Sequence, residues 1–422
     1  MICYAYPPYE AIGSVRSSNL SKEFSQYFDE VRVITTRNIN KNQIVDNSKN
    51  ISVTRLFTLD YDLIRKGIKK IRPKSNKLQK AKPVIENSKP SILSRLLNSF
   101  PFNLIFGLGG LIYILHGMIM TIKHIDDDTV IFSSFSPVSD HIIAWFAKKI
   151  YPKSYWIADY RDAFFMPDEN RSVAPKMDSK IHQGVLNKAD LTTVVSHGLK
   201  NHFSQYTSKL EVIRNASTIT GNPRYLEPVS MNKFRVVYTG RLYQNKRNPS
   251  LLFEAIEELL EEGKIAKDTL EVVHAGSESA YWNSHAEKYS FDNVDLGLVS
   301  MEEARNLQIS SNILLMMNWN LPKLLGVLSG KLFEYFEIGN PVLAIIDGYN
   351  DEELNNIFTD LNAGMITYVS QKDIVGIKSF VLKYYRNWEK DAVSEKIINR
   401  ERLKKYSWTS VVKQFIQSVD AK

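Results

Sequence analysis

Short apolar runs alternate with amphipathic helical stretches along nearly the whole chain of 422 residues. This alternation is typical of βαβ units, in which helices join parallel strands. The run Ile313–Met317 contains only apolar residues, as expected of a central strand buried on both faces. The predicted strands are residues 1–6, 31–35, 51–56, 130–133, 155–159, 191–195, 234–239, 270–274, 313–317 and 341–346. The sequence therefore predicts an α/β fold built on doubly wound parallel sheets.

The length of the chain and one polar stretch predict two domains. Domains usually hold ~100–200 residues, so a chain of this length is expected to form at least two. Residues 217–232 contain proline and show no periodicity, and we interpret them as a linker. We expect one domain at residues 1–216, with an excursion at 62–123, and a second at 233–404. Residues 405–422 are predicted to be helical.

Several kinds of site are disfavoured by the sequence. The single cysteine, Cys3, rules out an internal disulfide framework and fits a reducing cytoplasm. No basic region precedes the first apolar residues, so no secretory leader is expected. No Cys/His cluster has metal-ligand spacing, and Asp126–Asp128 precedes a predicted strand, so we predict no metal site. Dinucleotide-binding and hydrolase motifs are also missing.

The net charge of +8 is concentrated before the most apolar part of the chain. Between residues 65 and 89, Glu86 is the only acid, and the apolar stretch Phe102–Ile122 follows. This pattern is typical of proteins held on an anionic membrane surface. We favour a mainly buried crossover helix at Phe102–Ile122; insertion into a membrane surface and a transmembrane span are the alternatives. The basic run can also be a solvated excursion, and it lacks the interleaved aromatic residues of nucleic-acid binders. Its basic residues are Arg65, Lys66, Lys69, Lys70, Arg72, Lys74, Lys77, Lys80, Lys82 and Lys89.

The segment Lys331–Ala344 predicts a helix that ends at a glycine and leads into a buried strand. The glycine-bearing residues 326–330 precede it, so its first backbone N–H groups would be free to bind an anion. Lys331 adds a point charge suited to phosphate, and Glu334 can accept hydrogen bonds from sugar hydroxyls. The segment predicts a sugar-nucleotide site; the alternative is an ordinary helix with a solvated Lys/Glu face.

This segment resembles the nucleotide-binding helix of retaining family 4 glycosyltransferases of the two-domain GT-B type, in their bacterial surface-polysaccharide branch. Other stretches match motifs of that family in the same order along the chain, and the order is the specific part of the resemblance. Residues 60–125 match nothing in it. The matching stretches are Ser133–Pro137, Trp156–Asp162, Val212–Ala216, Tyr238–Leu242 with Lys246, and Val294–Gly297 with Ser300–Glu303.

The resemblance implies two Rossmann-like domains that face each other across a cleft, with a C-terminal helix returning to the N-terminal domain. It implies metal-independent, cofactor-free transfer of a sugar, with retention, from a nucleoside diphosphate that we expect to be uridine diphosphate. The expected acceptor is a hydroxyl of a glycan or a polyprenyl-linked glycan, and the expected location is the cytoplasm or the inner face of the membrane. Two alternatives stay open: a sugar-nucleotide epimerase or hydrolase of the same fold, and a non-catalytic membrane adaptor.

The same resemblance implies which residues form the site. Arg241 and Lys246 would neutralise the diphosphate, and Glu334 would bind the ribose, so these three are the catalytic candidates. Gly326 stands where the family has a second carboxylate, so backbone N–H groups of 325–328 would have to replace it, or sugar recognition lies elsewhere. The remaining donor-site candidates are Gly13, Val299, Gly326, Leu328, Lys331 and Leu332. The acceptor-side candidates are Asp159, Arg161 and Asp162. We interpret His141 as structural and Arg247 as a bystander.

Overall fold

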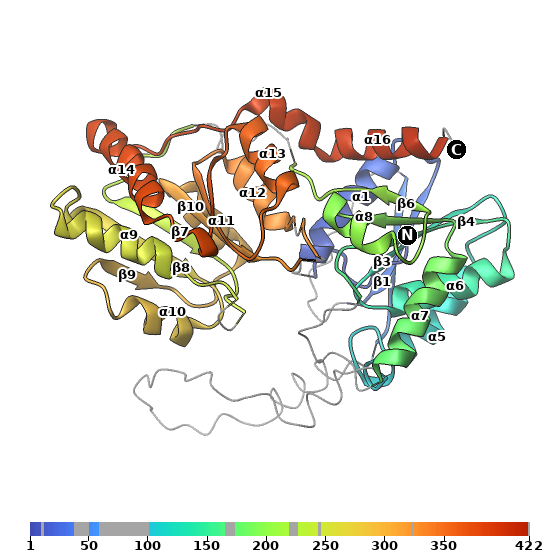
Figure 1. The fold of residues 1–422 in the computed structure, drawn as a ribbon. Coiled ribbons are helices and arrows are strands. Elements are labelled where there is room, and N and C mark those ends of the chain that lie inside the picture. The colour runs from blue at the N-terminus through green and yellow to red at the C-terminus, as the bar shows by residue number, and fades with distance from the viewer. Residues whose placement is uncertain are drawn as a thin grey trace, which may run out of the picture. The chain divides into compact units, whose positions relative to one another are not determined.

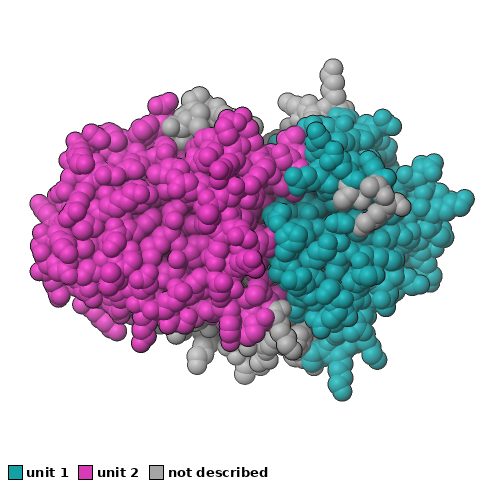
Figure 2. Space-filling view, turned by 45° about the horizontal axis from the view of Figure 1, so that its top comes forward, with its two compact units in different colours: residues 1–214, 412–422 teal, residues 215–411 magenta. Residues whose placement is uncertain are grey.

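The computed structural model describes residues 1–9, 12–37, 50–58, 101–164, 174–218, 227–243, 246–322, 324–326 and 328–420. The chain forms two compact units, coloured teal and magenta in Figure 2. The first consists of Met1–Arg214 with Val412–Lys422, and the second of Asn215–Val411. Each unit is built on its own parallel sheet.

The strands of the first unit are all parallel, and Ile2 joins their two groups. Ile2 bridges Ile34 of one group and Ser133 of the other, so the order is β2-β1-Ile2-β3-β4-β5-β6. The predicted strand at residues 1–6 is thus reduced to this bridge. Strand order reverses on the two sides of Ile2, which makes the sheet doubly wound, as predicted. The strands are β1 (Val31–Thr36), β2 (Ile51–Leu56), β3 (Val130–Phe135), β4 (Tyr155–Tyr160), β5 (Leu191–Val194) and β6 (Leu210–Val212).

Helices cover both faces of this sheet (Figure 1). The last helix of the chain, α16, returns to the first unit, where Phe415 packs against Phe24 of α1 with ring centroids 6.4 Å apart. This return was predicted. Helices α5, α6 and α7 lie side by side on the opposite face. The helices are α1 (Ile12–Phe24), α4 (Asn103–Phe106), α5 (Leu111–Ile122), α6 (Ser139–Ile150), α7 (Pro175–Lys188), α8 (His197–Phe203) and α16 (Trp408–Asp420).

The predicted helix at Phe102–Ile122 is interrupted and only half buried. Gly107–Gly110 separate α4 from α5, and Gly109 has φ +69°, a conformation that favours glycine. One face of α5 is buried, while the other is exposed, so the prediction of a mainly buried helix was wrong for the outer face. Among the described residues, no helix combines the length and the apolar character that crossing a bilayer requires.

The second unit has a single six-stranded parallel sheet in the order β12-β11-β10-β7-β8-β9. Large apolar clusters pack on its two faces, as the uninterrupted apolar strand patterns predict. Its strands are β7 (Phe234–Thr239), β8 (Leu270–Ala275), β9 (Asp292–Asp295), β10 (Ile313–Trp319), β11 (Val342–Asp347) and β12 (Gly364–Tyr368). Its helices are α9 (Ser250–Glu261), α10 (Ser279–Ala286), α11 (Met301–Ile309), α12 (Gly330–Ile338), α13 (Glu352–Leu361), α14 (Ile374–Asp391) and α15 (Arg400–Leu403), with short 3₁₀ turns at Lys267–Thr269, Val369–Gln371 and Lys404–Tyr406.

Local sequence signals set several helix ends in this unit. Ser300 and Glu303 form the predicted capping box at the start of α11, each side chain accepting a backbone N–H of the other residue. Gly339 ends α12 with φ +91°, and its N–H donates to the carbonyl of Tyr335.

Candidate functional site

The strand order of the second unit reverses between β7 and β10, and α12 begins beyond the carboxyl end of β10. Ligands of doubly wound sheets bind at such a switch point, outside the carboxyl ends of the strands. Thr239 and Gly240 end β7, Trp319 ends β10, and Lys331 lies in the first turn of α12. This position is therefore the candidate site.

The start of α12 is open to an anion. Ser329 precedes the helix in an extended conformation, with φ −69° and ψ 150°, and its side chain makes no capping hydrogen bond. The first turn contains no acidic residue. The partial positive charge of the helix N-terminus is therefore not offset by a local carboxylate in its first turn, as in helices that bind phosphate.

Lys331 lies half-buried at this position. Its Nζ donates to the carbonyl oxygen of Thr239 and lies 5.3 Å from the ring centroid of Tyr238. Burial, and secondarily the nearby Arg247, lower the pKa of the Lys331 ammonium to about 7, while Glu334 opposes the shift. Gly240 has φ +140°, a conformation that favours glycine, and a Cβ there would displace Nζ of Lys331.

Three cations lie on the loop after β7. Arg241 is 56% exposed; its Nε is 3.7 Å from a carboxylate oxygen of Glu278, and its guanidinium is 5.1 Å from the ring centroid of Tyr243. Nζ of Lys246 lies 5.2 Å from the ring centroid of Trp319. The structure thus brings the predicted residues Arg241, Lys246 and Lys331 to the carboxyl ends of β7 and β10.

The third cation, Arg247, is predicted from the sequence to be a bystander. In the structure, however, it makes more contacts than the other two cations. Its guanidinium stacks on Tyr243 at 4.7 Å and on Trp319 at 5.3 Å. It donates to the carbonyl of Arg241 at 3.0 Å and to the hydroxyl of Tyr238 at 3.4 Å. Among the described residues, its buried Nε has no hydrogen-bond partner. Sequence reasoning also missed Trp319; the available signal was an aromatic residue at the end of a buried strand.

A buried histidine supports the loop from below. Nδ1 of His274 donates to the carboxylate of Asp295 at 2.9 Å, and Nε2 lies 3.3 Å from the carbonyl oxygen of Gly240. Its ring stacks on Trp282 with centroids 4.8 Å apart. Burial lowers the pKa of His274 although Asp295 raises it, so the ring is neutral near pH 7. These contacts hold the Gly240 backbone in place.

The remaining donor-site candidates differ in their surroundings. Glu334 is half-buried in the second turn of α12, and Arg305 donates to its backbone carbonyl at 3.2 Å. Leu332 is fully buried in the core. Leu328 is buried as well, and its carbonyl accepts a hydrogen bond of 3.1 Å from Asn215. Val299 is half-buried in the loop after β9.

At the position of the missing carboxylate, Gly326 has φ +72° and donates its N–H to Asp351 at 2.8 Å. Asp351 also caps α13 by accepting from the N–H of Leu354 at 3.2 Å. The Gly326 N–H is therefore occupied by the protein itself. Val327 lies outside the described residues.

The acceptor-side candidates belong to the first unit. Asp159 is fully buried and pairs with Arg16 at 2.8 Å, while Ser134 and Thr193 donate to it at 2.9 Å each. All four side chains are buried, so Asp159 holds the strand ends together.

The neighbouring Arg161 donates to the carbonyls of Phe135 and Ser136 at 2.8 and 2.9 Å. Its guanidinium packs against Gly13, where a Cβ would collide with it. Asp162 is exposed. His141 is buried, its Nδ1 is 2.8 Å from the hydroxyl of Ser133, and burial lowers its pKa well below the usual value. Among the described residues, Nε2 of His141 has no partner.

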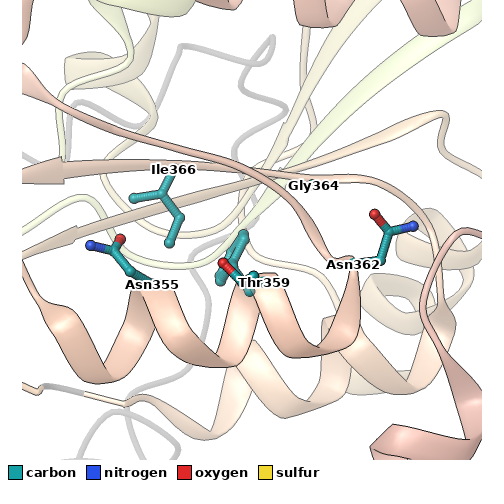
Figure 3. Close-up of a pocket in the computed structure, with 6 residues that line it drawn as sticks. Asn355, Thr359, Asn362, Gly364 and Ile366 are labelled. Carbon is teal, nitrogen blue, oxygen red and sulfur yellow. The ribbon is translucent and has the colours of Figure 1, made fainter.

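A separate cavity of about 350 Å³ lies between α13 and the edge strand β12 (Figure 3). Its lining is neutral, so it offers no charge to a diphosphate. It is lined by Asn355, Phe358, Thr359, Asn362, Gly364 and Ile366. Within the part of the chain that the structure describes, no group of three or more His, Cys, Asp or Glu side chains could hold a metal ion.

The sequence matches no protein-family model and no curated protein. Solved structures nevertheless align with the whole chain. TarM aligns with TM-score 0.60 at 10% identity, covering 99% of this chain and 97% of TarM. A structure described as "Trehalose-6-phosphate from E. coli bound with UDP-2-fluoro glucose" aligns with TM-score 0.60 at 12% identity, covering 99% and 98%. The lipopolysaccharide outer core galactosyltransferase WaaB aligns with TM-score 0.53 at 13% identity, covering 100% and 98%. These likenesses show the fold: two Rossmann-like parallel-sheet domains of the GT-B type, as predicted.

Proposed function

We propose that this protein is a glycosyltransferase that binds a nucleoside diphosphate sugar in its second unit and transfers the sugar, with retention, to a hydroxyl of a glycan or lipid-linked acceptor. The observation that carries the proposal is the half-buried Lys331 at the uncapped start of α12, with Arg247 near it and Lys246 over the ring of Trp319. Such a group of cations at a helix N-terminus suits a diphosphate.

The chemistry of transfer explains why the charges are needed. As the bond between the anomeric carbon and the phosphate oxygen breaks, negative charge grows on the departing diphosphate. Arg247, Lys331 and the first N–H groups of α12 would stabilise that charge because they are already in place before reaction. The acceptor oxygen forms the new bond on the same face of the sugar, and its proton passes to an oxygen of the leaving phosphate. Glu334 would accept hydrogen bonds from the ribose hydroxyls.

A uridine diphosphate sugar is the donor we propose. One of the aligned structures is described as holding a uridine diphosphate sugar analogue. The guanidinium of Arg247 suits a charged phosphate, and the rings of Tyr243 and Trp319 suit a planar base that stacks on them. We propose that the acceptor is an intermediate of bacterial surface-polysaccharide synthesis.

The experiment is a calorimetric titration with a panel of sugar nucleotides, followed by turnover with the donor that binds. Glu334→Ala, Arg241→Ala and Arg247→Ala should each weaken binding, by at least about tenfold for Arg247→Ala, which removes a charge-assisted contact. Lys264→Ala is the matched control, because that exposed lysine pairs with Glu262 away from the site. Normal donor turnover in all three site variants would refute the assignment.

Analysis of the products distinguishes a transferase from the two alternative enzymes, an epimerase and a hydrolase. With donor alone, an epimerase yields a second sugar nucleotide and a hydrolase yields free sugar. A transferase requires an acceptor hydroxyl to release most of its nucleoside diphosphate. Rapid release or epimerisation of the sugar without acceptor would contradict transfer.

A further inference from the structure

The outer surface of α4 and α5 carries six exposed aliphatic side chains. We call this surface the apolar face; its members are Ile105, Leu108, Leu111, Ile112, Leu115 and Ile119. Their side chains are between 38% and 55% exposed. On α5 they recur at spacings of one, three and four residues, which places them along one side of the helix. The face therefore runs the length of α5.

Contacts on the buried side of α5 fix the orientation of the helix. Tyr113 is fully buried, and its hydroxyl donates to the buried Asp140 at 2.8 Å. Gly117 packs so closely on Ile143 of α6 that a Cβ would not fit. Because the helix is anchored by these contacts, it cannot rotate to bury the apolar face. The exposure belongs to the folded unit rather than to a loosely attached helix.

The composition of the apolar face favours lipid over a protein partner. All six members are Leu or Ile, whereas protein interfaces are enriched in Tyr, Trp and Arg. Phe146 and Ile150 of α6 extend the exposed apolar surface. At ~18 Å, a helix of the length of α5 is too short to cross a hydrocarbon core of ~30 Å, so it would lie in the membrane plane.

Charge indicates which lipid would be bound. Lys123 follows α5, and the exposed acids Asp126–Asp128 come in the turn after it. The exposed Lys149 and Lys153 lie at the end of α6. The residues that precede the apolar face in the sequence are strongly basic from 65 to 89, and they lie outside the described residues. Apolar side chains beside cations are the combination that binds anionic membrane surfaces.

We propose that the apolar face inserts into the interfacial region of a membrane that contains anionic lipid. This surface belongs to the first unit, whereas the proposed diphosphate-binding residues belong to the second, and the inference does not depend on the proposed reaction. An enzyme held in this way would meet lipid-linked acceptors at the membrane surface.

The test is flotation of the full chain with phosphatidylcholine vesicles, with and without phosphatidylglycerol. The wild type should float with the anionic vesicles, and the double variant Leu115→Ser/Ile119→Ser should bind them at least about tenfold more weakly, because each buried CH₂ contributes to insertion. The matched control is Leu298→Ser/Val375→Ser, which removes two side chains of the second unit that are 73% and 76% exposed. That control should float like the wild type.

A second measurement reports insertion directly. Cys3 is buried, so a Leu115→Cys variant can be labelled selectively with an environment-sensitive fluorophore. Its emission should shift to the blue when anionic vesicles are added. Equal flotation of the Leu115→Ser/Ile119→Ser variant and the wild type would overturn the proposal, as would equal binding to neutral vesicles. A different result would assign the face to a second copy of the chain instead. In that case the wild type would be dimeric in light scattering and would not float, and the Leu115→Ser/Ile119→Ser variant would be monomeric.

Discussion

Lys331 leads to a prediction about how donor binding depends on pH. In the free protein, burial lowers the pKa of this ammonium to about 7, and its Nζ is bonded to the carbonyl of Thr239. A diphosphate beside it favours the charged form, so binding should raise the pKa and take up a proton. His274 does not take up a proton in this range, because burial lowers its pKa and keeps the ring neutral.

The size of the effect follows from the fraction of Lys331 that is protonated before binding. With a pKa of about 7, roughly half of the protein is protonated at pH 7 and about one per cent at pH 9. The dissociation constant should therefore rise about fifty-fold between pH 7 and pH 9, and it should be nearly constant below about pH 6. At pH 8, about 0.9 proton should be taken up per donor bound.

The assay is calorimetry with a uridine diphosphate sugar in buffers of different ionisation enthalpy, which gives both the dissociation constant and the proton uptake. The two phosphoryl groups of such a donor have no second ionisation near neutral pH, so the titration reports the protein near neutral pH, before the uracil N–H begins to ionise in alkaline buffer. Lys331→Arg keeps the charge and should flatten the pH dependence, while Lys331→Met should bind weakly at every pH.

Protein stability provides the control for Lys331→Met. The pKa of Lys331 is lower in the folded protein than in the unfolded chain, so the unfolded chain binds more protons between about pH 7 and pH 10.5. The stability of the wild type should therefore rise with pH across that window. Removing the buried amine should leave the melting temperature at pH 7 unchanged or raised. A dissociation constant that is independent of pH, with no proton uptake, would refute the role of Lys331.

The other predictions concern stability and the shape of the site. Asp159→Ala should lower the free energy of unfolding by about 3–5 kcal/mol in urea denaturation, because it removes the carboxylate that neutralises the buried guanidinium of Arg16; a loss no larger than that of the exposed control Asp162→Ala would show that the pair is unimportant. Asp351→Ala should cost about 1–2 kcal/mol, since it removes the cap of α13 and the acceptor of the Gly326 N–H, and unchanged thermal melting would contradict this. Gly240→Ala should weaken donor binding in calorimetry, because a Cβ at φ +140° strains the backbone and would displace Nζ of Lys331, and unchanged affinity would place the diphosphate elsewhere.

Patterns confined to neighbouring residues were sufficient to predict most elements. The apolar runs at Phe234–Thr239 and Ile51–Leu56 became strands with the predicted bounds. The capping box at Ser300 and the helix end at Gly339 formed as expected. Each of these signals depends on backbone conformation and hydrogen bonds within a few residues, which the local sequence controls.

The α4–α5 region shows where local pattern fails. Residues 102–122 are apolar on every side, so their periodicity does not show which face is buried. The contacts of Tyr113 with Asp140 and of Gly117 with Ile143 decide the orientation, and they join separate elements. The outer face could therefore be recognised only in the folded unit.

The sequence by itself determined the α/β class, most of the strands and the positions of the main charged candidates, but it missed the strands at Leu210–Val212, Asp292–Asp295 and Gly364–Tyr368. Only the tertiary structure decided which of those charges are buried and what they contact. Asp159 pairs with Arg16, 143 residues away, and Lys331 bonds to Thr239, 92 residues away. The stacking of Arg247 on Trp319 likewise depends on two strands meeting at the switch point. The physical reason is that burial and pairing, which set the pKa of a side chain and its capacity to bind, arise from contacts between segments distant in the chain.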